Sequence, residues 1–312
     1  MPIPPRLRWR LDQLRKKTSS AFIGQKEPPR PKLCPACGTL VGATATRCHQ
    51  CGANLTFSLA AASKSVGSLM PSASPVTYAI LSVSCVLYVV SLLATVREGG
   101  FPMPTSGGFS AIFDFAAIRG DVLLRLGESI PFPYILATGQ AWRFVTAIFL
   151  HGSLLHIVFN MWMLMDVGPQ IEERYGSARY FFIYVASGVG GYVVSSGVIG
   201  HQSVGASGAL LGLIGVLLAT TVGNRSASSR MLRSQLLIWL AFILIWGLTS
   251  PNIDNFAHAG GFATGFILGR ILPDRPPATP EARKRAYILG WITAVVVVAS
   301  FVMMALWLRS AD

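Results

Sequence analysis

The chain has 312 residues, of which 52% are hydrophobic and only 12% are charged, and its mean hydropathy is +0.53. This balance excludes a water-soluble globular protein of this size and places most of the chain in lipid. The formal net charge is +13. Because the Lys and Arg residues lie near the N-terminus and in short loops between apolar runs, they indicate membrane topology and not a nucleic-acid surface.

Residues 1–33 form a basic, proline-rich arm. The arm lacks the uninterrupted apolar stretch and the small-residue cleavage site of a removable signal peptide. We therefore expect the first membrane span to be an uncleaved anchor. We interpret the arm as a solvated cytoplasmic tail held loosely against anionic headgroups, with a specific docking role as the alternative.

Two Cys-x-x-Cys pairs follow the arm, each with a glycine after it. Their members are Cys34, Cys37, Cys48 and Cys51. Two such pairs this close together can place four thiolates tetrahedrally around one zinc ion. Disulfides or chance are the alternatives, but thiols stay reduced on the side of the membrane that we expect to be cytoplasmic.

We therefore predict a zinc ribbon over residues 34–55, with His49 as a bystander. A four-cysteine site is closed, so this zinc would be structural, and no cofactor is expected for catalysis. The ribbon could recruit a soluble cytoplasmic partner, sense metal, or only cap the N-terminal region.

Seven apolar runs of roughly membrane-spanning length follow a linker over residues 56–75. They cover residues 76–96, 144–165, 180–199, 205–222, 234–248, 256–272 and 286–308. The first six form a core over residues 76–272, and the seventh is an additional C-terminal span. The segment 97–143 is apolar but interrupted by charge and proline, which predicts an interfacial, partly membrane-immersed structure. The predicted fold class is an all-α polytopic membrane protein.

Basic residues in the short loops indicate the orientation. If the N-terminus is cytoplasmic, the inner loops after the second, fourth and sixth spans carry Arg and Lys, whereas the short outer loops around His201 and Pro251 carry neither. This distribution follows the positive-inside rule. We expect a multi-pass protein of the bacterial inner membrane with a cytoplasmic N-terminus.

Few strongly polar side chains lie in the apolar runs, where such groups usually face a partner or a water-filled cavity. They are His151, His156, Asn160, Ser207 and His258. His156 and Asn160 are four residues apart and so share one helix face. Counting along the helix gives about 22 Å from Ser207, and about 21 Å from His258, to the ends of their runs. The two side chains should therefore lie at a similar depth.

Glycines on the fourth and sixth runs permit a close approach of the two helices. They are Gly208 and Gly212 on the fourth run, which opens with Gly205 of the Gly-Ala-Ser-Gly motif, and Gly261, Gly265 and Gly269 on the sixth. Alone, such spacing usually marks ordinary helix packing, but with the matched depth it predicts contact between Ser207 and His258, as for a nucleophile and its base. Asp254 could be a third member, although we favour its role as a helix N-cap.

Several motifs resemble the rhomboid intramembrane proteases in content and order. They are TGQAWRFVTAIFLHGSLLHIVFNMW, IEERYG, GASG and DNFAHAGGFATG, and the resemblance covers roughly residues 76–272. The resemblance implies that Ser207 is the nucleophile and His258 its sole catalytic partner. It also implies that His156, Asn160 and the Ser207 backbone amide form the oxyanion hole.

The resemblance extends to supporting residues. Trp142 and Arg143 match the family's Trp-Arg pair in the first loop, and Glu172 and Arg174 match its acidic-x-Arg pair. One departure is Leu211, because many members have an aromatic residue one turn after the serine. The support of the His258 ring is therefore less well explained.

By this resemblance the chain would be an intramembrane serine endopeptidase that cleaves peptide bonds in or near transmembrane segments. Its partners would be the lipid bilayer and transmembrane substrates, with an outward-opening site and the fifth span as a gate. The alternative is a non-catalytic rhomboid-like binder or escort, but such members usually lack the serine or the histidine. A transporter would distribute its polar groups across the whole membrane, whereas here they cluster in the outer half.

Overall fold

The computed structural model describes residues 31–34, 39–43, 45–50, 74–99, 115–198, 200, 202–250 and 253–311. The chain divides into two compact units, Met1–Leu69 and Met70–Asp312. Each unit is described by itself. Most of the predicted arm and linker lie outside the described residues.

The first unit contains a short hairpin. Strands β1 (Lys32–Leu33) and β2 (Leu40–Val41) pair in the antiparallel sense. Cys34 directly follows β1, and its side chain is buried in a small cluster with those of Val41 and Cys48. The hairpin thus places two of the predicted zinc ligands in one small core.

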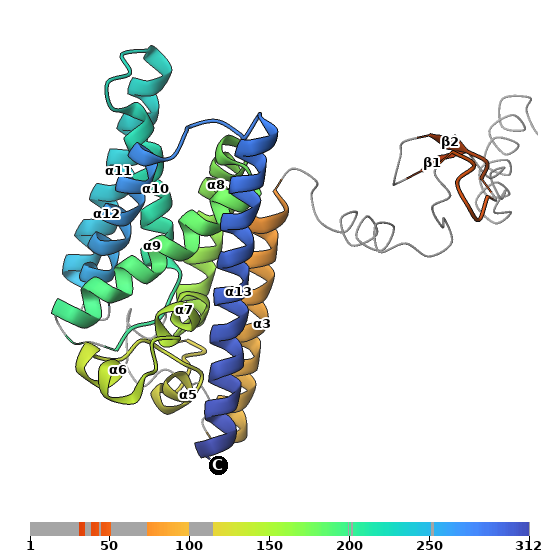
Figure 1. Ribbon diagram of the computed structural model, residues 1–312. Helices are drawn as coiled ribbons and strands as arrows, with labels where there is room; N and C mark the ends of the chain where they lie inside the picture. The colour runs from red at the N-terminus through yellow and green to blue at the C-terminus, as the bar shows by residue number, and fades with distance from the viewer. Residues whose placement is uncertain are drawn as a thin grey trace, which may run out of the picture. The chain divides into compact units, whose positions relative to one another are not determined.

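The second unit is helical, and the predicted all-α class is confirmed for it. Its elements in chain order are α3 (Pro75–Arg97), α5 (Gly120–Arg125), α6 (Phe132–Thr138), α7 (Arg143–Thr146), the 3-10 turn η1 (Ala147–Phe149), α8 (Leu154–Tyr175), α9 (Ser177–Val198), α10 (Ser207–Thr221), α11 (Ala227–Thr249), α12 (Asn255–Ile271) and α13 (Pro280–Ala311), shown in Figure 1.

Four helices in the described part of the chain are long and apolar enough to cross a membrane, namely α3, α9, α11 and α13. The pair formed by residues 143–149 and α8 makes a fifth candidate, bent by 89°. The chain is therefore a multi-pass integral membrane protein. Helices α10 and α12 have 15 and 17 residues, which is short for a span, so the count of seven spans stays a prediction.

The second long helix begins later than the sequence predicted. The apolar run from residue 144 divides at residues 150–153, and α8 starts only after Ser153, whose hydroxyl accepts a hydrogen bond from the His156 N–H at 3.4 Å. The first piece is buried in the protein, with Ala147 fully inaccessible. A segment buried in protein and a segment facing lipid are equally apolar. The sequence pattern therefore predicted one continuous helix where the structure has two separate segments.

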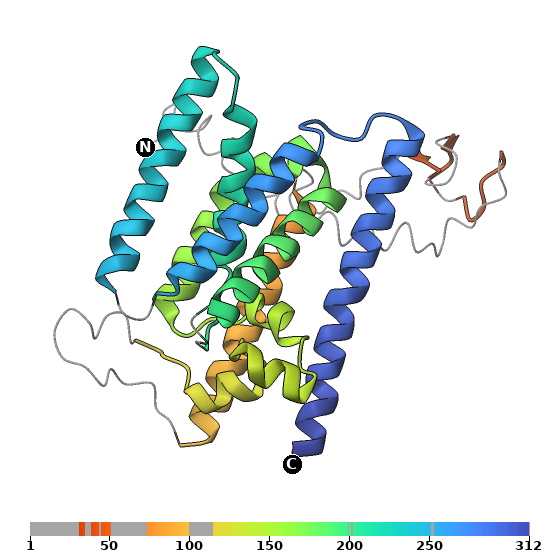
Figure 2. The same ribbon diagram turned by 60° about the vertical axis from the view of Figure 1, so that its left-hand side comes forward.

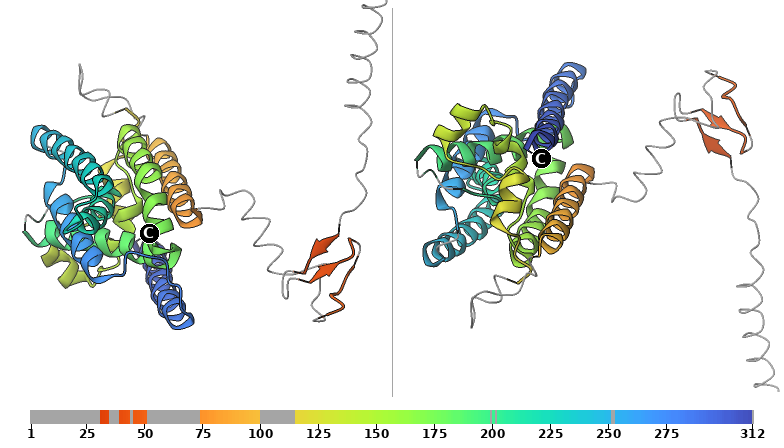
Figure 3. Two further views of the ribbon diagram at one scale, coloured as in Figure 1. Left: turned by 90° about the horizontal axis from the view of Figure 1, so that it is seen from above. Right: turned by 90° about the horizontal axis from the view of Figure 1, so that it is seen from below.

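Helix α10 is the centre of the second unit. Twelve of its 15 residues are buried, as expected for a helix that is apolar on all sides. It packs mainly against α12, α9 and α8, and Figure 2 shows these helices side by side. In the end-on views of Figure 3, α13 lies at the rim of the bundle.

Short helices α5, α6 and α7 gather at the end of the unit where α10 begins (Figure 1). Helix α6 exposes Phe132, Tyr134 and Leu136, which is typical of a segment lying in a membrane interface. The described part of the 97–143 segment is therefore a set of short helices and contains no long span.

Candidate active site

Ser207 is the first residue of α10. Gly205, two residues earlier, has a φ of 123°, a conformation that side chains rarely allow. Its N–H donates to the Ala147 carbonyl at 3.0 Å, and its own carbonyl accepts from the Tyr192 hydroxyl at 2.6 Å. These two bonds fix the backbone that leads into the serine.

His258 lies in the first turn of α12. Asp254 caps this helix, because its carboxylate accepts from the Ala257 N–H at 2.9 Å and also from the Ser195 hydroxyl. The predicted N-cap is thus confirmed. Both carboxylate oxygens have partners other than His258, so the geometry does not make Asp254 a third member of the site.

The Ser207 and His258 side chains meet. His258 Nε2 lies 2.9 Å from Ser207 Oγ. In the neutral tautomer protonated at Nδ1, Nε2 accepts a hydrogen bond from the hydroxyl, which is the arrangement that a general base requires. Both residues are half-buried, so the pair is partly protected from solvent but still accessible.

Glycines produce this contact by removing side chains between α10 and α12. A Cβ at Gly208 would lie 3.1 Å from the Ala257 carbonyl oxygen. A Cβ at Gly261 or Gly265 would collide with the backbone of Gly208 or Gly212, respectively. Backbone therefore packs on backbone, as small-residue stripes permit.

Two hydrogen-bond donors on α8 point to the same place. A Cβ at Gly205 would lie 2.5 Å from His156 Nε2 and 3.6 Å from Asn160 Nδ2. His156 Nδ1 accepts from the Gly152 N–H at 3.4 Å, which leaves the proton of a neutral ring on Nε2. Asn160 Nδ2 is buried and has no partner among the described residues. Both donors are thus free to bond a group beside Ser207.

The segment that contains Ser207 and His258 is similar to known proteins. Residues 138–275 match the family model of the rhomboid domain. This segment is thus similar to the rhomboid domain. The match includes every residue of the geometry just described, from Ala147 to Gly265.

Similar proteins support the rhomboid family for this chain. RHOMBOID-like protein 6, mitochondrial, from Arabidopsis thaliana is 34% identical over 206 residues, which cover 59% of this chain and 66% of the relative. Rhomboid protease GluP from Bacillus subtilis is 36% identical over 138 residues, covering 44% and 27%. Rhomboid-like protease 1 from Toxoplasma gondii is 32% identical over 176 residues, covering 53% and 59%. The chain thus spans less than two thirds of each relative's length.

Within the segment that matches the rhomboid model, Arg143 organises the residues before α8. Its guanidinium packs over the rings of both Trp142 and Trp307, at 4.7 and 4.9 Å from their centres. It donates to the Leu124 carbonyl at 2.7 Å and the Glu128 carbonyl at 3.1 Å. Burial raises the pKa of the Glu128 side chain to about 7, against the opposing effect of Arg143. The Trp-Arg pair therefore ties the first loop to α13 and does not touch Ser207 or His258.

Glu172 and Arg174 lie at the other end of α8, far from Ser207. The Glu172 carboxylate accepts from the Val76 and Thr77 amides at 3.0 and 2.9 Å and from the Thr77 and Ser177 hydroxyls at 2.8 and 2.7 Å. Arg174 forms an ion pair of 3.3 Å with Asp274. This pair of residues joins helix ends and has a structural role.

We expect Glu172→Ala to destabilise the protein by on the order of 3 kcal/mol, because four donors would lose a charged acceptor in a buried site. The measurement is the free energy of unfolding in detergent micelles. Glu173→Ala is the matched control, since Glu173 is the exposed neighbour and should change stability by less than about 0.5 kcal/mol. Equal effects of the two substitutions would contradict this role for Glu172.

Two other predicted residues lie beside the site without joining it. The His151 ring is fully buried, 5.1 Å from the His156 ring, and neither of its nitrogens has a partner among the described residues. Leu211 is buried one turn after Ser207. No aromatic contact to His258 occurs in the described part of the chain. Tyr192 and Trp307, by contrast, were missed by the sequence analysis.

Two of the four predicted zinc ligands, Cys34 and Cys48, lie within the described residues, and both side chains are buried. The Gln50 N–H points at Cys48 Sγ at 3.4 Å, a contact that suits a metal-bound thiolate. Cys37 and Cys51 lie outside the described residues. Among the described residues, no cluster of three potential metal ligands occurs. His49 is exposed. The residues described fit the predicted ribbon but do not test its metal.

Proposed function

We propose that this protein is an intramembrane serine endopeptidase that hydrolyses peptide bonds in or next to transmembrane segments. The observation that carries the proposal is the 2.9 Å contact between Ser207 Oγ and His258 Nε2. A serine hydroxyl is a weak nucleophile until a neutral imidazole accepts its proton. A rhomboid domain over residues 138–275 and relatives with protease in their names support this assignment.

In the first half-reaction, Ser207 Oγ attacks the scissile carbonyl carbon and its proton moves to His258 Nε2. The carbonyl oxygen becomes an oxyanion. The Ser207 N–H has no partner within its helix because it opens α10, and together with His156 Nε2 and Asn160 Nδ2 it supplies donors aimed at that charge. The C–N bond then breaks, and the amine leaves with the proton from His258.

In the second half-reaction, water attacks the acyl-enzyme ester. His258 accepts a proton from the water and returns it to Ser207 Oγ as the ester bond breaks. The half-buried setting of both side chains is compatible with limited access of water. A substrate helix must unwind locally, because its carbonyl groups are otherwise engaged in helix hydrogen bonds.

The competing function is a non-catalytic binder or escort of membrane proteins. Incubation of the purified protein in liposomes with single-span reporter proteins separates the two. Site-specific cleavage of a reporter supports the peptidase. Stable capture of uncleaved reporters, with no reaction of Ser207 toward a serine-directed fluorophosphonate, would instead favour the binder.

The membrane that houses the protein is a separate proposal. Positive charge in the short loops favours a cytoplasmic N-terminus with the site opening to the other side, and a bacterial inner membrane is the location that we predict. The similar proteins come from a bacterium and from eukaryotes, and the plant relatives favour a eukaryotic membrane as the alternative. Fractionation of the native host and protease protection of the two chain ends test location and orientation.

We also propose that the N-terminal cysteines hold one structural zinc ion. Cys34 and Cys48 would be ligands together with Cys37 and Cys51, and the metal would fold the ribbon without joining the peptidase chemistry. We expect about one zinc ion per chain by elemental mass spectrometry, and a strong reduction in Cys48→Ser. Unchanged zinc content in that variant would contradict the proposal.

A further inference from the structure

Asp166 is a charged residue in the middle of a membrane helix. It lies on α8, about 18 Å from the helix end near Ser207 and about 13 Å from the other end. Its carboxylate has no hydrogen bond or ion pair with any described residue, and only its backbone oxygen accepts a bond, from Gln170. A carboxylate at this depth is costly and usually has a dedicated partner.

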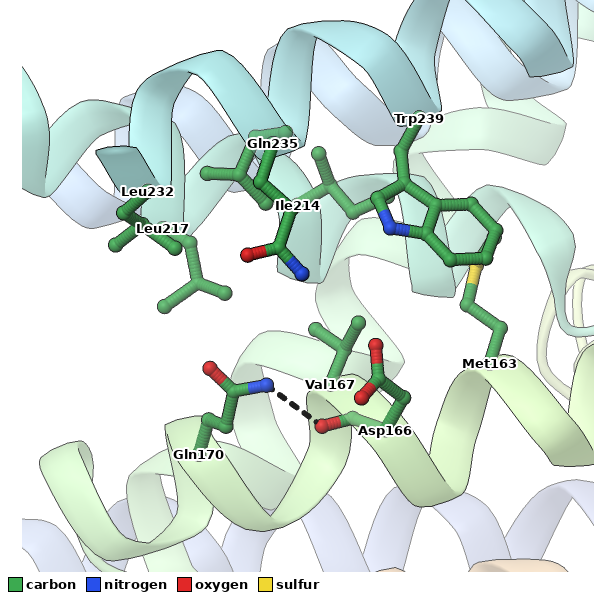
Figure 4. Close-up of a pocket in the computed structure, with 10 residues that line it drawn as sticks. Met163, Asp166, Val167, Gln170, Ile214, Leu217, Leu232, Gln235 and Trp239 are labelled. Atoms are coloured by element: carbon green, nitrogen blue, oxygen red, sulfur yellow. Dashed lines mark hydrogen bonds between the residues drawn. The ribbon is translucent and has the colours of Figure 1, made fainter. Parts of the chain in front are cut away.

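The Asp166 side chain faces a small crevice between α8, α10 and α11. Its volume is about 20 Å³, enough for about one water molecule or the end of one side chain. Asp166 and Gln170 reach it from α8 and Gln235 from α11, as Figure 4 shows. We call these three residues the α8–α11 subsite.

The subsite offers mainly hydrogen-bond acceptors. The Gln170 side-chain amide donates one hydrogen to the Asp166 backbone oxygen at 2.8 Å. The side-chain carbonyl oxygen of Gln170 remains available as an acceptor. An ionised Asp166 carboxylate can only accept. The complementary group is therefore a donor that carries positive charge.

Helix α11 covers the crevice loosely. Only Leu236, Ile243 and Gly247 of this helix are buried. Aromatic pairs connect it to α8, with Trp162–Trp239 and Phe159–Trp246 ring centres 5.4 and 5.2 Å apart. Such contacts contribute about 0.5–1.5 kcal/mol each beyond their buried area, so another helix can compete for the α8 face at modest cost.

The crevice lies in line with the candidate active site. Ile214 and Leu217 of α10 line it, and they follow Ser207 by 7 and 10 residues, which is about 10–15 Å along the helix axis. A ligand helix running parallel to α10 covers that distance in about seven to ten residues. A side chain at that spacing from the scissile bond would reach Asp166.

We propose that the α8–α11 subsite binds a Lys or Arg side chain of the substrate's transmembrane helix, about seven to ten residues from the scissile bond. The proposal rests on the proposed peptidase function and adds a substrate class to it. Long basic side chains keep their stems in the apolar region while their charge reaches a polar group. Asp166 supplies that polar group where α8 and its neighbours leave it without a partner.

The test compares two reporters that differ only at this spacing, one with Lys and one with Leu, cleaved in liposomes by the full-length parent and by Asp166→Asn. We expect the variant to lose tenfold or more in kcat/KM on the Lys reporter and to match the parent on the Leu reporter. Glu173→Gln makes the same chemical change on the same helix outside the crevice and should leave both rates unchanged. Fluorophosphonate uptake at the parental rate would show that Ser207 is undisturbed in Asp166→Asn.

Equal losses on both reporters would overturn the proposal, because Asp166 would then act on the fold. Equal rates for parent and Asp166→Asn on the Lys reporter would overturn it as well. If the parent cleaves neither reporter and takes up no fluorophosphonate, the peptidase function itself is refuted. The subsite proposal, which depends on that function, is then refuted as well. The failure of one proposal is thus distinguishable from the failure of the other.

Discussion

Replacement of Ser207 by alanine is expected to reduce cleavage of a transmembrane reporter by about 10⁴-fold to 10⁶-fold, which is to background. The reason is chemical, since Ser207 Oγ is the side-chain oxygen that contacts His258 Nε2 among the described residues, at 2.9 Å. The measurement is single-turnover cleavage by purified protein in liposomes. The loss should appear in kcat, because the hydroxyl reacts only in the transition state.

Ser203→Ala is the matched control for this experiment. Ser203 lies four residues before Ser207, and its backbone pairs with Ser129, so the side-chain change should leave cleavage near the parental rate. The Ser207→Ala variant should also unfold at the parental denaturant concentration. Residual cleavage within tenfold of the parent would show that another group attacks the substrate.

Gly265→Ala is expected to lower activity by about 100-fold or more and stability by about 2–3 kcal/mol. A Cβ at this position would collide with the Gly212 carbonyl oxygen and with the Gly212 Cα. Backbone cannot yield as a flexible side chain can, so α12 must move away from α10. His258 stands on α12 and would move away from Ser207 with it.

The control for Gly265→Ala is Gly197→Ala on α9. A Cβ at Gly197 would have nothing within 4 Å, so an alanine in this helix should stabilise the protein by about 0.5–1 kcal/mol. Both substitutions add one methyl group to a helical glycine, and only the packing differs. If Gly265→Ala keeps parental activity and stability, the close packing of α10 on α12 does not hold the site together.

The helical elements could be predicted because long apolar runs bounded by charge and turn residues leave few alternatives in a membrane. The predicted run 76–96 matches α3 almost residue for residue, and 256–272 matches α12. The prediction for the run from residue 144 was wrong at its start, because a buried segment and a lipid-facing helix have the same apolar composition. The predicted zinc ribbon, which falls partly outside the described residues, stays a prediction.

The candidate site was also predicted only in part. Glycine spacing and matched depth were enough to predict that α10 and α12 meet with Ser207 facing His258. Tyr192 and Trp307 were missed because their partners, the Gly205 carbonyl and the Arg143 guanidinium, lie on other segments, and only the packing of these segments brings them together. Asp166 is visible in the sequence, but the subsite it shares with Gln235 requires the packing of α8 beside α11.

The rate of fluorophosphonate labelling, with the modified residue assigned by mass spectrometry, tests the central claim most directly. The reagent needs an activated hydroxyl but no substrate helix, so it probes the Ser207–His258 pair without depending on substrate choice. We predict that the parent is labelled on Ser207 alone and that His258→Ala is labelled at least about 100-fold more slowly. Labelling at another residue, or an unchanged rate in His258→Ala, would contradict the account.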